Sequence, residues 1–199
     1  MLSWDNKNTG GNEKIFNQGV AGECLATMTV ESAKGKLGPN GNPLPDYVLY
    51  TIKFKDNANP DSRPLDVSIN RINETTASGQ PTKPAAISAR LNFVAQVFRA
   101  ALPGKELPEL ANTGDDVADA NKAIVDAMEM VVAAGSKTVR VFAHFEKAGS
   151  PHAYLNVRQG FDGAGVLAVG SDEVFEPSKF MERPKADVQE QVPPSDLPF

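Results

Sequence analysis

Side chains that act as metal ligands or nucleophiles are few in this chain: its single cysteine is Cys24, and its two histidines are His144 and His152. The histidines do not form an HExxH pair, and together with Cys24 they would still lack the fourth ligand of a structural zinc site. The glycines between residues 160 and 165 do not follow a strand and open a helix, as a dinucleotide-binding motif requires. We therefore expect no catalytic residues, no metal, no cofactor and no enzymatic activity.

Aromatic and basic side chains, in contrast, recur together on the outward faces of three predicted strands. Alternation of apolar and polar residues over 138–145 turns Arg140, Phe142 and His144 away from the core. The same pattern applies to segments 46–55 and 153–158. The outward-facing candidates of the three strands are Tyr47, Lys53, Lys55, Arg140, Phe142, His144, Tyr154 and Arg158. Basic candidates in the neighbouring predicted loops are Lys34, Lys36 and Arg71.

Such faces are typical of single-strand binding, because bases stack on aromatic rings while lysine and arginine neutralise phosphates. These contacts read no base edges, so the binding would have little sequence preference. Tyr47, Phe142 and Tyr154 are the stacking candidates. One alternative is that the N-terminal segment or a partner covers these rings. Another is that the chain is a protein-interaction module whose exposed aromatic residues form a protein interface. A small-molecule enzyme on a β-barrel scaffold is the third interpretation.

The elements that must position these residues follow from periodicity and turn residues. Apolar alternation predicts strands, and apolar residues at helical spacing predict two helices. The predicted strands are 22–31, 46–55, 65–70, 138–145 and 153–158, with a weaker extended segment at 166–169. The predicted helices are 84–102 and 115–134. Thr82 is the expected N-cap of the first helix, a Thr113–Asp116 capping box is expected to open the second, and Gly135 is expected to end it.

Three strands, a helical element and two strands form the order of an OB-fold, a five-stranded Greek-key barrel, although other α+β arrangements have the same order. We therefore expect a mainly β (α+β) domain over residues 1–183, with a helical insert at about 84–135 between the third and fourth strands. Residues 184–199 are rich in Pro and Gln and short of bulky apolar residues, which predicts a disordered C-terminal tail.

The overall charge does not exclude a polyanionic ligand. The formal net charge is −5, but residues 106–129 contribute −6 and residues 182–199 contribute −2, which leaves +3 on the remainder. A local basic surface matters more to a polyanion than the total does. The lone cysteine fits a reducing compartment, and the sequence has neither a membrane span nor a secretory signal, so we expect a cytoplasmic protein.

The last residues carry a family resemblance. The chain ends in Asp196, Leu197, Pro198 and Phe199. This end resembles the acidic–aliphatic–Pro–Phe tip of bacterial single-stranded DNA-binding proteins. The stretches GVAGEC, PDYVLYTIKFKD and TVRVFAHFEKAGSPHAYLNVR are similar to a phage-type member of this group.

The resemblance implies an OB-fold protein that binds and protects single-stranded DNA in replication, recombination and repair. It also implies that the tip, 196–199, recruits replication or recombination proteins, because a terminal Phe fills an apolar pocket while carboxylates meet a basic rim. A bacteriophage origin would place the protein in the cytoplasm of the bacterial host.

Overall fold

The computed structural model describes residues 16–38, 41–145, 155–159 and 163–176. Its elements, in chain order, are a 3-10 turn η2 (Phe16–Gly19), β1 (Gly22–Ser32), β2 (Val48–Asp56), β3 (Leu65–Asn70), α1 (Pro84–Ala101), α2 (Asp116–Ala134), β4 (Lys137–Phe145), β5 (Leu155–Val157) and β6 (Val166–Ala168). The strands and the two helices fall where the sequence predicts them, to within a few residues at either end, whereas η2 was not predicted. The expected disordered tail, 184–199, lies outside the described residues.

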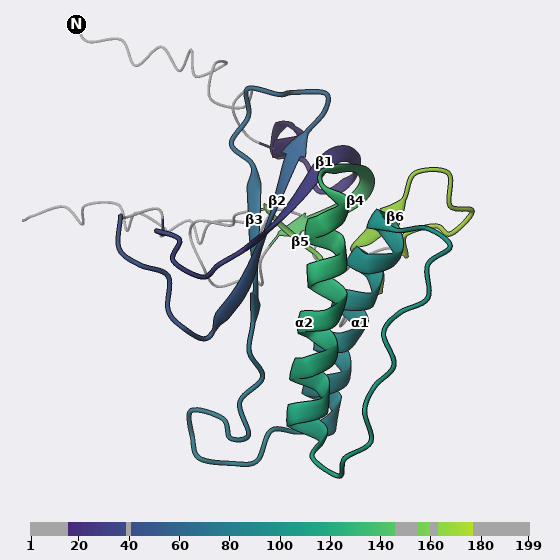
Figure 1. The fold of residues 1–199 in the computed structure, drawn as a ribbon. Helices are drawn as coiled ribbons and strands as arrows, with labels where there is room; N and C mark the ends of the chain where they lie inside the picture. The colour runs from purple at the N-terminus through teal and green to yellow at the C-terminus, as the bar shows by residue number, and fades with distance from the viewer. Residues whose placement is uncertain (1–15, 39–40, 146–154, 160–162, 177–199) are drawn as a thin grey trace, which may run out of the picture.

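The strands form a nearly closed antiparallel barrel. Their order is β3–β2–β1–β4–β5, and β3 lies beside β5 without a ladder of hydrogen bonds between the described residues of the two strands. The two helices are inserted between β3 and β4 (Figure 1). The expected OB-like barrel with a helical insert is therefore confirmed.

One edge of β4 is shared by two short strands. Ala143 of β4 pairs with Val157 of β5, and Val141 pairs with Val166 of β6. Phe142 lies between these two pairs, where its N–H donates to the carbonyl of Gly165 and its carbonyl accepts from the N–H of Arg158. Arg158 and Gly165 therefore lie close together at this edge of β4. β6 adds a sixth strand beside the five of the barrel.

Alternating apolar residues fill the barrel. Met28, Ile52 and Val141 are almost completely buried, one from each of β1, β2 and β4. Their neighbours in sequence point outward, because successive side chains of a strand lie on opposite faces. Phe98 of α1 and Met128 of α2 join the same core. The sequence predicts this inner face correctly.

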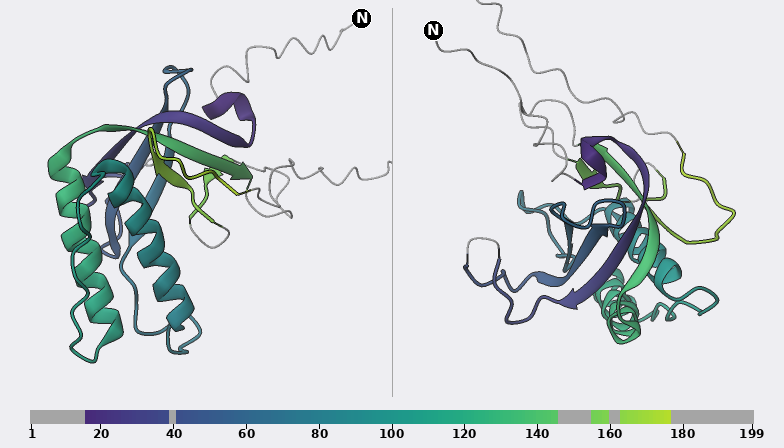
Figure 2. Two further views of the ribbon diagram at one scale, coloured as in Figure 1. Left: turned by 90° about the vertical axis from the view of Figure 1, so that its right-hand side faces the viewer. Right: turned by 90° about the horizontal axis from the view of Figure 1, so that it is seen from above.

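The two helices lie side by side and run in the same direction (Figures 1 and 2). Residues 102–115 make this possible by returning along the helices from the end of α1 to the start of α2. Near that start, the side chain of Asn121 both accepts from the N–H and donates to the carbonyl of Ile72, at 2.8 Å each. This amide pair fixes the insert to the chain that leaves β3.

The helix starts differ from the expectation. Asp115, and not Thr113, caps α2 by accepting from the N–H groups of Val117 and Ala118. Thr113 instead donates to the carboxylate of Asp119. At α1 the N-cap is Lys83, which makes no side-chain cap bond, so the Thr82 expectation is also wrong. Gly135 ends α2 with a φ of 71°, a left-handed value that suits glycine, as expected.

Candidate nucleic-acid interface

The structure gathers one group of the candidates on the open outer side of β1, β2 and the loop 33–47. We call this surface, which carries Lys34, Lys36, Tyr47, Lys53 and Lys55, the lysine face. All five residues are exposed. They reach the same surface because Lys53 and Lys55 occupy alternate positions of β2, opposite Thr29 and Thr27 of β1.

Glu31 lies at the centre of the lysine face. Its Oε2 atom is 3.1 Å from Nζ of Lys36 and 3.7 Å from Nζ of Lys53. The hydrogen bond from Lys36 is the main reason that the pKa of Glu31 lies below its ordinary value, and the charges of both lysines add to the effect. Because the two lysine side chains are about half exposed and that of Glu31 is 35% exposed, these ion pairs are weak, and a phosphate can replace the carboxylate.

Tyr47 and Arg71 mark one end of this surface. The N–H of Arg71 donates to the carbonyl of Tyr47 at 2.7 Å, which joins the start of β2 to the end of β3. The Tyr47 side chain is 53% exposed. Arg71 lines an open hollow with Glu74 and Asp115, so its surroundings are partly acidic. Of the two, Tyr47 is therefore the better placed for a nucleic-acid ligand.

The second group of candidates is covered. We call Arg140, Phe142 and Arg158 the arginine cluster. The expectation that Phe142 and Arg158 face outward into solvent is wrong: they are 5% and 1% exposed. The guanidinium of Arg158 lies over the Phe142 ring, with 4.9 Å from Cζ to the ring centroid. Strand alternation does not reach Arg158, because β5 ends at Val157.

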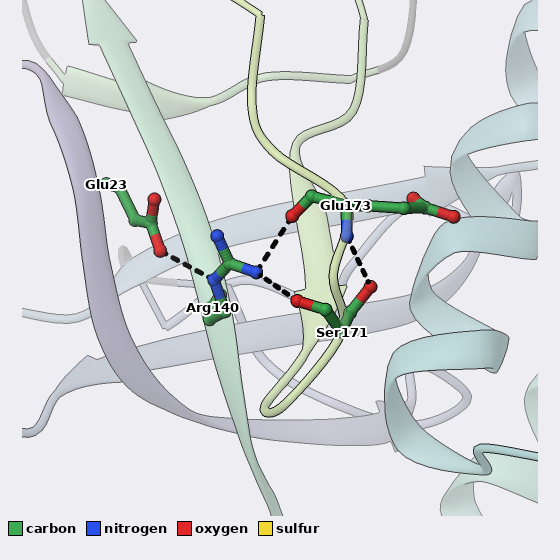
Figure 3. Close-up of polar contacts among 4 residues, drawn as sticks. All are labelled: Glu23, Arg140, Ser171 and Glu173. Carbon is green, nitrogen blue, oxygen red and sulfur yellow. Dashed lines mark hydrogen bonds and ion pairs between the residues drawn. The ribbon is translucent and has the colours of Figure 1, made fainter.

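Arg140 and His144 are half-buried. Nε of Arg140 donates to Glu23 at 2.6 Å, and this hydrogen bond is the main reason that the pKa of Arg140 is raised. Nη1 of Arg140 donates to the main-chain carbonyls of Ser171 and Glu173, at 2.9 Å each (Figure 3). His144 lies opposite Asn156 of β5. Neither residue offers the open surface that the lysine face does.

The lysine face and the arginine cluster lie on one continuous outer surface. Thr27 of β1 pairs with both Lys55 of β2 and Thr138 of β4, and Leu25 pairs with Arg140. Paired residues of adjacent strands share a face, so only β1 separates Lys55 from Arg140. An extended ligand on the lysine face would therefore reach the covered residues next.

Several candidates lie outside the described residues. They are Tyr154, the tip residues Asp196, Leu197, Pro198 and Phe199, and also His152.

Three residues that shape this surface were not predicted from the sequence: Glu23, Glu31 and Phe175. Glu23 and Glu31 stand at outward positions of β1, which the alternation of 22–31 makes visible. Their pairing with Arg140 and Lys36, however, depends on residues distant in sequence. Phe175, which contacts the arginine cluster, follows β6 in a segment without periodicity. No local signal identifies it.

Three other features bear on possible functions: metal ligands, the thiol of Cys24 and the apolar character of the helices. No group of three or more His, Cys, Asp or Glu in the described part of the chain is arranged to hold a metal ion. Burial, with smaller effects from Asp56 and Glu23, raises the pKa of Cys24 to about 12, so the thiol is protonated at neutral pH. None of the described helices has both the length and the apolar character that crossing a membrane requires.

Comparisons of the chain with protein-family models, with curated proteins and with solved structures found no match.

Proposed function

We propose that this protein binds single-stranded DNA without sequence preference, through the lysine face, and protects it during replication or recombination. The observation that carries the proposal is the gathering of four lysines and an exposed tyrosine around β2 and the loop 33–47. On OB-folds in general, the face of the second and third strands and the loop between the first two strands bind oligonucleotides, which is an argument by analogy of fold.

The physical basis is electrostatic attraction with stacking. Lys53 and Lys55 lie two residues apart on one strand face, so they can contact neighbouring phosphates, while the exposed ring of Tyr47 offers a stacking platform. No base-reading contact is needed, which is why we propose binding that is independent of sequence. The resemblance of the sequence to phage-type single-stranded DNA-binding proteins supports the same function and a role in DNA replication, recombination or repair.

The test is titration of labelled oligo-dT by fluorescence anisotropy over a series of salt concentrations. The Lys53→Ala/Lys55→Ala double variant should bind roughly tenfold more weakly, and the slope of log affinity against log salt should flatten by about 0.7 for each lysine. The control is Lys105→Ala/Lys122→Ala, which removes the same charge from the helical insert and should change little. Equal losses in both variants would show only a general charge effect and contradict the lysine face as the site.

A protein-interaction module is the second candidate function. Exposed apolar side chains favour it: Leu37 and Tyr47 in the loop region are 64% and 53% exposed, and Leu25 of β1 is 48% exposed. A protein partner held by apolar contacts would bind with little dependence on salt. The salt series therefore separates the two candidates, since phosphate binding weakens steeply as salt rises.

The same proposal assigns recruitment of replication or recombination proteins to the tip formed by Asp196, Leu197, Pro198 and Phe199. Removing Phe199 alone takes away the apolar plug and moves the terminal carboxylate. A pulldown with purified replication proteins should then fail while oligo-dT binding persists. Equal capture by the full chain and the shortened chain would exclude a docking role for the tip.

A further inference from the structure

Residues 171–176, which follow β6, cross the outer face of β4, and we call them the strap. Figure 3 shows its first half: one nitrogen of Arg140, Nη1, donates to two strap carbonyls, those of Ser171 and Glu173. Further along, Nη1 of Arg158 donates to the carbonyl of Glu176 at 2.8 Å. The strap is therefore held to the barrel by guanidinium groups and main-chain oxygens.

One aromatic side chain anchors the strap. The Phe175 ring lies 5.4 Å from the ring of Phe142 between centroids, at an interplanar angle of 45°. The guanidinium carbon of Arg140 also lies 5.4 Å from the Phe175 centroid. Phe175 thus covers both Phe142, the stacking candidate of β4, and Arg140, its basic candidate.

The rest of the strap is weakly attached. None of its residues belongs to a strand ladder, and four of the six are exposed, with Val174 at 80%. The hydrogen bonds of its own N–H groups include those of Ser171 to Ala168 and of Glu173 to the Ser171 hydroxyl, both over 3 Å. A segment with few buried apolar contacts and an exposed backbone opens more easily than the sheet beneath it.

The strap presents to β4 an arrangement similar to that of a nucleotide, with acceptor oxygens on the arginines and an aromatic ring against Phe142. Its carbonyl oxygens accept from arginine where phosphate oxygens would, and the Phe175 ring meets Phe142 where a base would. Asp172, Glu173 and Glu176 add negative charge. Because the lysine face continues through Leu25 and Thr27 to Arg140, a strand bound there would meet the strap next.

From these contacts we infer that the strap occupies a second single-strand site on β4, and that single-stranded nucleic acid reaches Arg140 and Phe142 only by displacing it. This inference rests on the proposed function. The apparent affinity of this second site then equals its intrinsic affinity multiplied by the fraction of molecules in which the strap is open.

The test uses the full chain, oligo-dT and the Phe175→Ala variant. Loss of the ring should loosen the strap and raise the oligo-dT affinity about fivefold, since less binding energy is spent on opening. The matched control is Val174→Ala in the same strap, which should leave the affinity unchanged. A weaker Phe175→Ala complex would make Phe175 a stacking residue and overturn the inference, and so would an unchanged affinity.

Hydrogen exchange on the unaltered protein supplies a second measurement that depends on no substitution. Oligo-dT should speed exchange of the amides of residues 171–176 while it slows exchange on β1 and β2. Unchanged or slower exchange in the strap would overturn the inference, although the lysine-face site would still stand if the double-lysine variant lost affinity. If neither the unaltered protein nor Phe175→Ala binds oligo-dT, the proposed function fails and the strap inference fails with it.

Discussion

The lysine face and the arginine cluster are made of the same kinds of residue, basic side chains beside an aromatic ring, on one continuous outer surface of the barrel. On the lysine face Tyr47 is 53% exposed, and the side chain of Lys53 is 50% exposed. In the arginine cluster Phe142 is 5% exposed and the side chain of Arg140 is 16% exposed. The difference arises from a segment of the same chain, residues 171–176, that crosses only one of the two regions.

The same residue types make different contacts in the two regions. The lysines pair weakly with one shared carboxylate, that of Glu31, and their side chains remain largely in water. Arg140 and Arg158 donate hydrogen bonds to main-chain carbonyls of the strap, which covers them. Substitutions on the lysine face should therefore change binding with little effect on stability, whereas substitutions in the arginine cluster should change stability as well.

The largest contrast is expected between the two aromatic residues. Phe142→Ala removes a buried ring and should lower the free energy of unfolding by about 3 kcal/mol, as truncations of buried aromatic residues do. Tyr47→Ala should leave that free energy within about 0.5 kcal/mol but weaken oligo-dT binding by roughly 1–3 kcal/mol. Urea unfolding and anisotropy measure the two quantities. A stable Phe142→Ala variant would contradict the covered position of this ring.

A comparable contrast is expected between two glycines. A Cβ atom on Gly165 would lie 1.7 Å from the carbonyl oxygen of Arg158, so the backbone of one of these two residues must shift. Gly165→Ala should cost about 2–3 kcal/mol of stability, a value typical of forced overpacking. Gly38→Ala, in the loop of the lysine face, meets its nearest atom only at 3.4 Å and should cost less than about 0.5 kcal/mol. Similar unfolding midpoints for the two variants would refute this difference.

A smaller contrast separates the basic residues. Arg140→Ala loses hydrogen bonds to Glu23, Ser171 and Glu173, and it should lower the free energy of unfolding by roughly 2 kcal/mol, because bonds to a charged group are stronger than neutral ones. Lys53→Ala should change it by less than about 0.5 kcal/mol, since its ion pair is exposed. Chemical unfolding of both variants tests the order. The reverse order would contradict the distinction between the two regions.

The smallest effect is expected at Glu31. The pKa of this carboxyl group is lowered, chiefly by the hydrogen bond from Lys36, so its pairing is complete above the ordinary value of 4.5 and is lost only as the pH falls below it. Glu31→Gln removes the competing charge at neutral pH and should strengthen oligo-dT binding about two- to fivefold, in line with the small energies of exposed ion pairs. Glu109→Gln, in the loop between the helices, is the charge-matched control. An equal gain in that control would argue against local competition.

Periodicity and turn residues predicted the strands, the two helices and the buried face of the barrel. Alternation over β1, β2 and β4 identified residues such as Met28, Ile52 and Val141 as inward, because burial on one face of a strand leaves a period of two in the sequence. The order of strands and helices favoured an OB-like barrel over other α+β arrangements with the same order, and the strand pairing of the structure confirms it. The exposed positions of Lys53 and Lys55 also followed from alternation, since both residues lie within β2, whereas Tyr47 is exposed one residue before β2 begins.

Long-range packing, in contrast, determines which outward faces reach solvent. Alternation assigned Phe142 to the outer face correctly, but it carries no information about residues 171–176, which cover that face after a separation of about 30 residues in the chain. Arg158 was misassigned because β5 ends one residue earlier, so its side chain is placed by contacts with Phe142 and Glu176 and not by a strand. Exposure depends on contacts between distant segments, whereas periodicity reports only the local surroundings of each strand.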